Sequence, residues 1–193
     1  MKRTTMLLAA LFSLAAVAGC SDKSGGNPTP ETTTPPASTE TETSSAPSGP
    51  ELDLSKFTSK PCDVLTADQL AGVSNVRAPK TRTAPLGPTC NWESQDILKD
   101  TGFGVTLGAD QKFDSLLGNS RTSPIFTESK VSELRAFNFD STDGTRDCST
   151  VVETGKNSVI IAQAHVALQQ KGIKKPCEES QKIAAAVIST LKG

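Results

Sequence analysis

The chain has 193 residues, with 20 basic and 21 acidic side chains and a formal net charge of −1. Residues 51–193 hold equal numbers of basic and acidic residues, whereas a nucleic-acid-binding protein normally carries a basic excess. We therefore expect no nucleic-acid partner.

The first residues form a predicted export signal. Lys2 and Arg3 precede an uncharged stretch rich in Leu and Ala, residues 6–19, in which only Ser13 is polar. A basic start, a short apolar core and small residues before a cleavage point are typical of secretory signal peptides. The stretch is shorter than the roughly 20 residues that a membrane-spanning helix needs. We assign residues 1–19 to a signal peptide.

The end of this signal resembles the bacterial lipobox. In "VAGC" an aliphatic residue and two small residues precede Cys20. In signals of this kind the peptide is cut before the cysteine, whose thiol carries a diacylglyceryl group, and two or more acyl chains anchor a protein stably. The resemblance predicts that Cys20 is lipidated and holds the protein on the extracytoplasmic side of the cell membrane. The alternative is an ordinary signal peptide with an incidental cysteine.

Residues 20–54 are predicted to tether the folded part to this anchor. Residues 21–50 consist largely of Ser, Thr and Pro and have no apolar side chain larger than Ala. Such a segment cannot bury enough apolar surface to offset the entropy of ordering it. We expect a disordered spacer, either a plain solvated linker or an O-glycosylated stalk.

The remaining residues, 55–193, are enough for one globular domain. In "LTADQLAG", Thr66 and Gln69 predict a capping box at the start of a short helix, 67–71. An irregular stretch from 77 is followed by predicted strands near 89–95 and in 101–108 and by a helix in 110–119 that stops at Gly118. The rest of the chain is predicted to form a strand over 134–140, a hairpin around 154–157 and a terminal helix from Pro176. Together they predict an α+β domain: an antiparallel sheet of about four to five strands with helices packed on one face.

Besides Cys20 the chain has four cysteines, Cys62, Cys90, Cys148 and Cys177, which can form two disulfides in an exported protein. Four cysteines allow three pairings. Pairing them consecutively closes two loops of about 30 residues each, whereas the other pairings need longer, interlocked or nested loops. We favour the consecutive pairing. No two cysteines lie close in sequence as zinc ligands usually do, so we expect no metal and no cofactor.

The sequence offers little for catalysis. His165 is the only histidine, and a lone histidine in a strand is usually structural or exposed. There is no G-x-S-x-G motif and no phosphate-binding loop, and "FDSTDGTRD" does not fit the calcium-binding EF-hand pattern. Trp92 is expected to pack in the core beside a disulfide. The basic cluster of Lys171, Lys174 and Lys175 is expected to be a solvated loop, with a lipid-headgroup patch as the alternative.

Three motifs carry a family resemblance: "PCDVLT" at 61–66, "GPTCNW" at 87–92 and "PCEESQKIAAAVISTL" at 176–191. Together with the lipobox and the tether, they resemble the actinobacterial envelope lipoproteins of the domain of unknown function 3558 family. The resemblance is weaker between these motifs. It implies an envelope lipoprotein with both disulfides paired consecutively, and it implies no reaction because the family has no established activity.

These observations favour a binding function. We expect a membrane-anchored, extracytoplasmic module that binds an envelope protein or another surface partner, and we do not expect an enzyme. The alternative is a carrier or sensor that holds a small apolar molecule between sheet and helix. An envelope hydrolase ranks last, because nothing in the sequence favours paired catalytic carboxylates.

Overall fold

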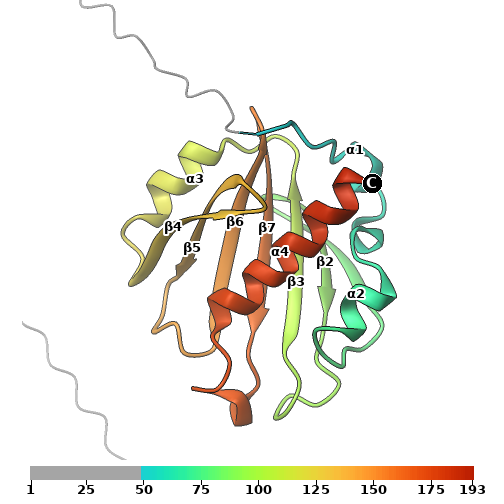
Figure 1. The fold of residues 1–193 in the computed structure, drawn as a ribbon, viewed down its shortest axis with the longest axis vertical. Coiled ribbons are helices and arrows are strands. Elements are labelled where there is room, and N and C mark those ends of the chain that lie inside the picture. Colours follow the sequence, from blue (N-terminus) through green and yellow to red (C-terminus); the bar gives the residue numbers. More distant parts are fainter. Residues whose placement is uncertain (1–48) are drawn as a thin grey trace, which may run out of the picture. The chain divides into compact units, whose positions relative to one another are not determined.

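The computed structural model describes residues 49–193, so the predicted signal peptide, Cys20 and most of the tether lie outside the described residues. Within these residues, seven antiparallel strands form one sheet in the order β1-β2-β3-β7-β6-β5-β4 (Figure 1). The strands are β1 (Lys80–Ala84), β2 (Gly87–Trp92), β3 (Gly102–Gly108), β4 (Ile125–Val131), β5 (Leu134–Asp140), β6 (Asp147–Gly155) and β7 (Ser158–His165). The α-helices are α1 (Ser55–Thr58), α2 (Ala67–Ala71), α3 (Phe113–Ser120) and α4 (Pro176–Lys192), and two 3-10 helices are η1 (Pro61–Val64) and η2 (Leu168–Gln170).

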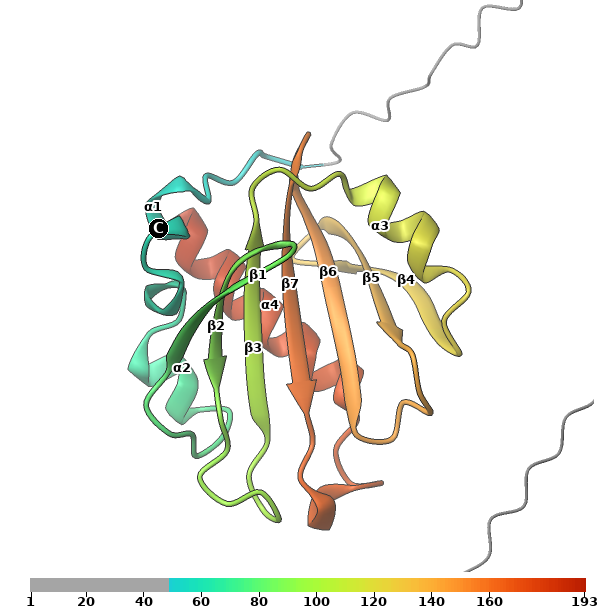
Figure 2. The ribbon, with the colours of Figure 1, turned by 180° about the vertical axis from the view of Figure 1, so that it is seen from behind.

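The long helix α4 packs across one face of the sheet, as Figure 1 and the reverse view in Figure 2 show. Its apolar stripe, which includes Ile183 and Val187, is fully buried against strand residues such as Val105 and Ile160. Burying one such side chain contributes about 1.5–3 kcal/mol, so this layer is a main source of stability. Among residues 49–193, no helix is long and apolar enough to cross a membrane.

The start of the folded part joins the same core. Leu52 and Leu54 are buried in it, and the backbone N–H of Leu52 donates to the carbonyl of Thr154 at 2.7 Å. Both leucines fall within the predicted tether, 20–54. The packed part of the chain therefore begins a few residues earlier than the predicted boundary.

The helix α3 covers the opposite face of the sheet. Phe113 and Leu117 of α3 pack on Phe137, Val151 and Ile161 of the strands. The rings of Phe113 and Phe137 meet edge to face, with centroids 5.3 Å apart. The prediction that the helices pack on one face is therefore wrong.

The reason for this second layer lies in the central strands. In β6, Val151 faces α3 while its neighbour Val152 faces α4. In β7, Ile161 likewise faces α3 and Ile160 faces α4. Because successive side chains of a strand point to opposite faces, strands that are apolar throughout must be covered on both faces. The apolar runs "TVV" in β6 and "VII" in β7 therefore need a helix on each face of the sheet.

The prediction of four to five strands is also too low, because two edge strands were not predicted. The strand β1 is almost entirely exposed and pairs only with β2, so it shows no apolar alternation. The strand β4 connects to β5 through Ser132 and Glu133, whose φ angles are 49° and 71°. A two-residue hairpin turn of this kind usually carries Gly or Asn, so this turn lacks its usual sequence signal.

Several local predictions are confirmed. The helix α2 covers the predicted residues 67–71, and its capping box is present: Thr66 Oγ1 accepts from Gln69 N at 3.3 Å, and Gln69 Oε1 accepts from Thr66 N at 2.7 Å. The helix α4 begins at Pro176 as predicted. The helix α3, however, continues through Gly118, the predicted stop, to Ser120.

The structure contains two disulfides, Cys62–Cys90 and Cys148–Cys177, which is the consecutive pairing. The first joins η1 to β2, and the second joins β6 to the first turn of α4. Each disulfide therefore fastens a segment on the α4 face of the sheet to a strand.

Candidate functional site

The helix α3 covers only part of its face of the sheet. Its aromatic cluster lies over the row that contains Phe137 and Val151. The next row toward the His165 end of β7 consists of Asn91, Gly104, Gln163 and Ser149, which the register places side by side on four adjacent strands. We call the part of this face around that row the open face.

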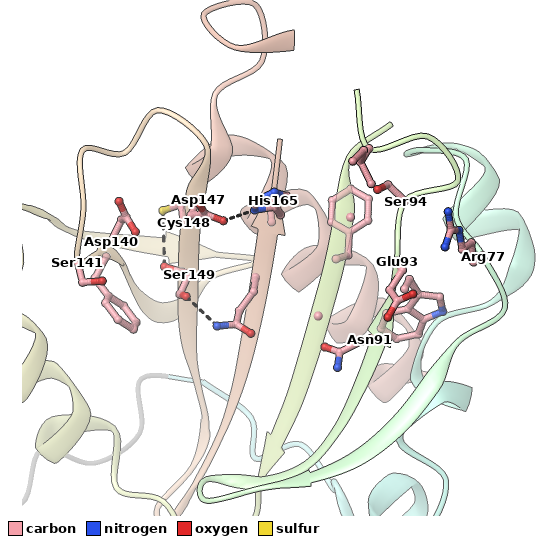
Figure 3. Close-up of a pocket in the computed structure, with 18 residues that line it drawn as sticks. Arg77, Asn91, Glu93, Ser94, Asp140, Ser141, Asp147, Cys148, Ser149 and His165 are labelled. Atoms are coloured by element: carbon pink, nitrogen blue, oxygen red, sulfur yellow. Dashed lines mark hydrogen bonds and ion pairs between the residues drawn. The ribbon is translucent and has the colours of Figure 1, made fainter. Parts of the chain in front are cut away.

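A groove of about 600 Å³ lies on the open face, within the size range of ligand-binding pockets (Figure 3). Figure 3 shows Asn91 and Glu93 on one side of the groove and Asp147 and Ser149 on the other. The residues that line its floor and nearest walls include Asn91, Gly102, Gly104, Ser149, Gln163 and His165. We refer to this feature as the groove.

The alternation of β3 produces the floor of the groove. Phe103, Val105 and Leu107 are buried in the core that β3 shares with α4, as their spacing predicted. The residues between them, Gly102 and Gly104, therefore point to the open face. Because neither has a side chain, backbone forms the floor of the groove at these two buried positions, and the side-chain amides of Asn91 and Gln163 lie over Gly104.

Two side-chain amides converge over this floor. A Cβ atom added to Gly104 would lie 3.0 Å from Asn91 Oδ1 and 3.3 Å from Gln163 Oε1. The amide nitrogen of Gln163 donates to Ser149 Oγ at 3.3 Å. Asn91 and Gln163 thus lie over Gly104 from the two neighbouring strands, β2 and β7.

A charged pair flanks the groove on the β2 side. Lys80 Nζ donates to both carboxylate oxygens of Glu93, at 3.0 and 2.9 Å. This hydrogen bond holds the pKa of the Glu93 carboxyl below its ordinary value. Arg77, which also lines the groove, donates to the carbonyl of Gln95 at 3.3 Å.

The single histidine lies at the end of the groove. His165 Nδ1 is 2.5 Å from Asp147 Oδ1, and His165 Nε2 is 2.5 Å from an Arg146 guanidinium nitrogen. Because a guanidinium group can only donate, Nε2 accepts and the proton lies on Nδ1, from which it is donated to Asp147. In a Ser–His–Asp triad Nε2 faces a hydroxyl. Here it faces Arg146, so this cluster is not arranged to activate a serine.

Two of the three lysines in the basic cluster near the C-terminal helix are in ion pairs. Lys174 Nζ is 3.3 Å from Glu179, and Lys175 Nζ donates to Glu178 at 2.8 Å. The bond from Lys175 lowers the pKa of Glu178. These pairs give no support to the headgroup patch that Lys171, Lys174 and Lys175 suggested.

The acidic stretch "FDSTDGTRD" forms a hydrogen-bonded turn. Asp140 Oδ2 accepts from the backbone N–H groups of Thr142 and Gly144, at 3.1 and 2.9 Å. The turn therefore uses the carboxylate for its own backbone. In the described part of the chain, no group of three or more His, Cys, Asp or Glu side chains is placed to hold a metal ion.

The predicted site residues fall mostly outside the groove. Cys20 lies outside the described residues. Of the disulfide cysteines, only Cys148 lines the groove, together with His165. Trp92 is 1% exposed and packs in the same core as Cys90, as expected. The signal that could have located the floor is "GFGVTLG", in which the large side chains occupy one face and Gly102 and Gly104 the other.

Comparison with known proteins identifies the family. Searches of curated proteins and of solved structures found no significant match to this chain. A family model described as "Protein of unknown function (DUF3558)" matches residues 15–190. This match spans the described domain almost completely and includes both disulfides and the groove. The chain therefore belongs to the DUF3558 family.

Proposed function

We propose that this protein is a membrane-anchored, extracytoplasmic binding module whose recognition surface is the groove. The observation that carries the proposal is the open face itself. The helix α3 covers one part of this sheet face, while another part forms a preformed concavity with a glycine floor and converging polar side chains. Small-molecule and ligand sites are typically preformed concavities with a few convergent polar groups.

The position of the groove suits a tethered module. The described chain enters beside the β6–β7 hairpin, where Leu52 pairs with Thr154. The groove reaches His165 at the opposite end of β7, a strand of eight residues and roughly 23 Å. A lipid on Cys20 and a tether entering at one end would leave the His165 end of the groove farthest from the point of attachment.

The alternative function, a carrier of an apolar molecule, needs space between sheet and α4. In that layer Val105, Ile160, Ile183 and Val187 are each 0% exposed and belong to one packed cluster. The side chains of the protein already occupy the volume that an apolar ligand would need. The geometry therefore favours the groove over the interior.

The lipid anchor is tested by Cys20→Ala in a bacterial host that processes lipoproteins. The thiol is the only predicted attachment point, so the variant should be lost from the membrane fraction and appear in the soluble fraction. Ser21→Ala, which keeps the cysteine, serves as the control. A Cys20→Ala chain as abundant in membranes as wild type would contradict the anchor.

The recognition surface is tested by photo-crosslinking in the cell envelope. Gln163 is replaced by p-benzoylphenylalanine, which inserts into C–H bonds of any bound molecule, and Lys192 at the exposed end of α4 receives the same substitution as the control. Mass spectrometry should find a reproducible adduct at Gln163 that is missing at Lys192. No adduct at Gln163, or the same adducts at both positions, would contradict the proposal.

A further inference from the structure

We propose that the groove binds an uncharged saccharide that lies across the strands over Gly102 and Gly104. This inference rests on the proposed function, because it specifies the ligand class of the same groove. It is carried by three features of the groove: its charged groups balance in number, its remaining hydrogen-bonding groups are neutral, and its glycine floor has no full explanation in the fold.

The first feature is the state of the charged side chains that line the groove. Glu93 is held by Lys80, and Asp147 by His165. Asp140 accepts bonds from its own turn, and Arg77 donates to a backbone carbonyl. The three carboxylates among these side chains are matched in number by three cations at or beside the groove, Arg77, Lys80 and Arg146. The groove therefore carries no net charge that would select a phosphate, a carboxylate or an amine.

The second feature is the set of groups that retain hydrogen-bonding capacity. Within residues 49–193, the side-chain amide of Asn91 makes no hydrogen bond, and Gln163 uses only its nitrogen, toward Ser149. An amide both donates and accepts, and a serine hydroxyl does the same. Sugar hydroxyl groups have this same dual character, so they can pair with Asn91, Gln163 and Ser149 without changing the charge of the site.

The third feature is Gly102. A Cβ atom there would make only ordinary contacts, 3.4 Å from the Trp92 carbonyl oxygen and 3.5 Å from Ser94 N. An alanine would therefore fit the domain itself. Glycine inside a strand weakens the strand and often marks a place where a ligand approaches the backbone. A ring resting on bare backbone explains why this position carries no side chain.

The walls provide apolar contacts for such a ring. Phe139 ends the same row of residues, opposite Ser149, and the exposed side chain of Ile97 lies at the rim. A sugar ring has apolar C–H faces and polar edges, which match apolar walls beside an amide floor. An extended peptide, by contrast, is usually recognised by adding a strand at a sheet edge, whereas this groove crosses the middle of a sheet face.

The test uses the full chain with Cys20→Ala, applied to an array of neutral and charged oligosaccharides. We expect binding to neutral oligosaccharides, and calorimetry with the best of them then compares variants. Gly102→Ala should raise the Kd at least tenfold, because its methyl group occupies the groove floor. Asn91→Leu, which keeps the size but removes the amide, should do the same. Gly118→Ala, the same substitution on α3, should leave the Kd within twofold.

Three results would overturn the inference. They are binding to no neutral oligosaccharide, binding only to charged ones, and neutral binding that Gly102→Ala and Asn91→Leu leave unchanged. Circular dichroism of each variant separates a blocked groove from a lost fold. A protein adduct at Gln163 together with an array that shows no binding would retain the groove as the recognition surface and reject the saccharide.

Discussion

Glu153 is a buried acid that helps to fasten α3 to the sheet. Its carboxylate is 3.3 Å from the Arg135 guanidinium, which also contacts Asp114 of α3 at 2.8 Å and lies 4.7 Å from the centre of the Phe113 ring. One arginine thus links a strand acid to both an acid and an aromatic ring of the helix. Because the side chain of Glu153 is only 7% exposed, burial penalises its charged form.

This burial predicts a pH dependence of stability. Burial raises the pKa of the Glu153 carboxyl above its ordinary value of 4.5, despite the opposing effect of Arg135. The folded state then binds the proton more tightly than the unfolded state. The stabilising contribution of this group is therefore complete below the unfolded-state pKa and is lost as pH rises through the folded-state pKa.

The substitution Glu153→Gln removes this titration. The free energy of unfolding of wild type minus that of the variant should fall as pH is raised from about 4 to about 7. Urea unfolding of both proteins over this range measures the difference. A difference that stays constant, or that increases with pH, would show that burial does not control this carboxyl.

Among the single elements, the helix α3 is less stable than it could be, because its interior contains a glycine. Gly118 lies inside the helix, and a Cβ atom added there would meet no atom within 4 Å. Glycine in a helix interior costs about 0.5–1 kcal/mol relative to alanine, because the unfolded chain loses more conformational freedom. Gly118→Ala should therefore raise the free energy of unfolding by about that amount. Urea unfolding that shows a loss of stability would contradict this view of α3.

The elements differ in how far the sequence predicts them. The helices α2 and α4 begin at Thr66 and Pro176 with capping signals that are local in sequence, and both were predicted. The strand β4 was not predicted, because its turn at Ser132 and Glu133 uses residues that rarely adopt positive φ. Capping residues near in sequence identify where these helices start. The β4–β5 hairpin has no such local signal and forms through the pairing of β5 with β6 in the sheet.

The groove could not be predicted for a related reason. Its floor unites Asn91, Gly104, Ser149 and Gln163, which come from four strands and lie side by side only through the register of three strand pairs. No local pattern specifies the neighbours of a strand when they are distant in sequence. The disulfide pairing, in contrast, was favoured by counting and spacing, because the four cysteines besides Cys20 have only three pairings and the consecutive one closes the shorter loops.

For the whole molecule, the two disulfides should contribute almost equally to stability. They close loops of nearly the same length, with sequence separations of 28 and 29 residues. In the chain-entropy model each closure stabilises the fold by about 3.5 kcal/mol, because it restricts the unfolded chain. The model takes no account of which elements each disulfide joins.

Replacing each pair with alanine tests this account. The double variants Cys62→Ala/Cys90→Ala and Cys148→Ala/Cys177→Ala should each lose about 3.5 kcal/mol in urea unfolding at the same pH. A much larger loss for the second pair would mean that docking of α4 on the sheet, rather than the entropy of the unfolded chain, depends on Cys148–Cys177. If the groove binds a saccharide as proposed, that binding should weaken as well, because Cys148 precedes Ser149 in β6 and both residues line the groove. Equal losses with unchanged binding would show that both disulfides act by restricting the unfolded chain. They would also show that the sheet keeps the groove in shape without either disulfide.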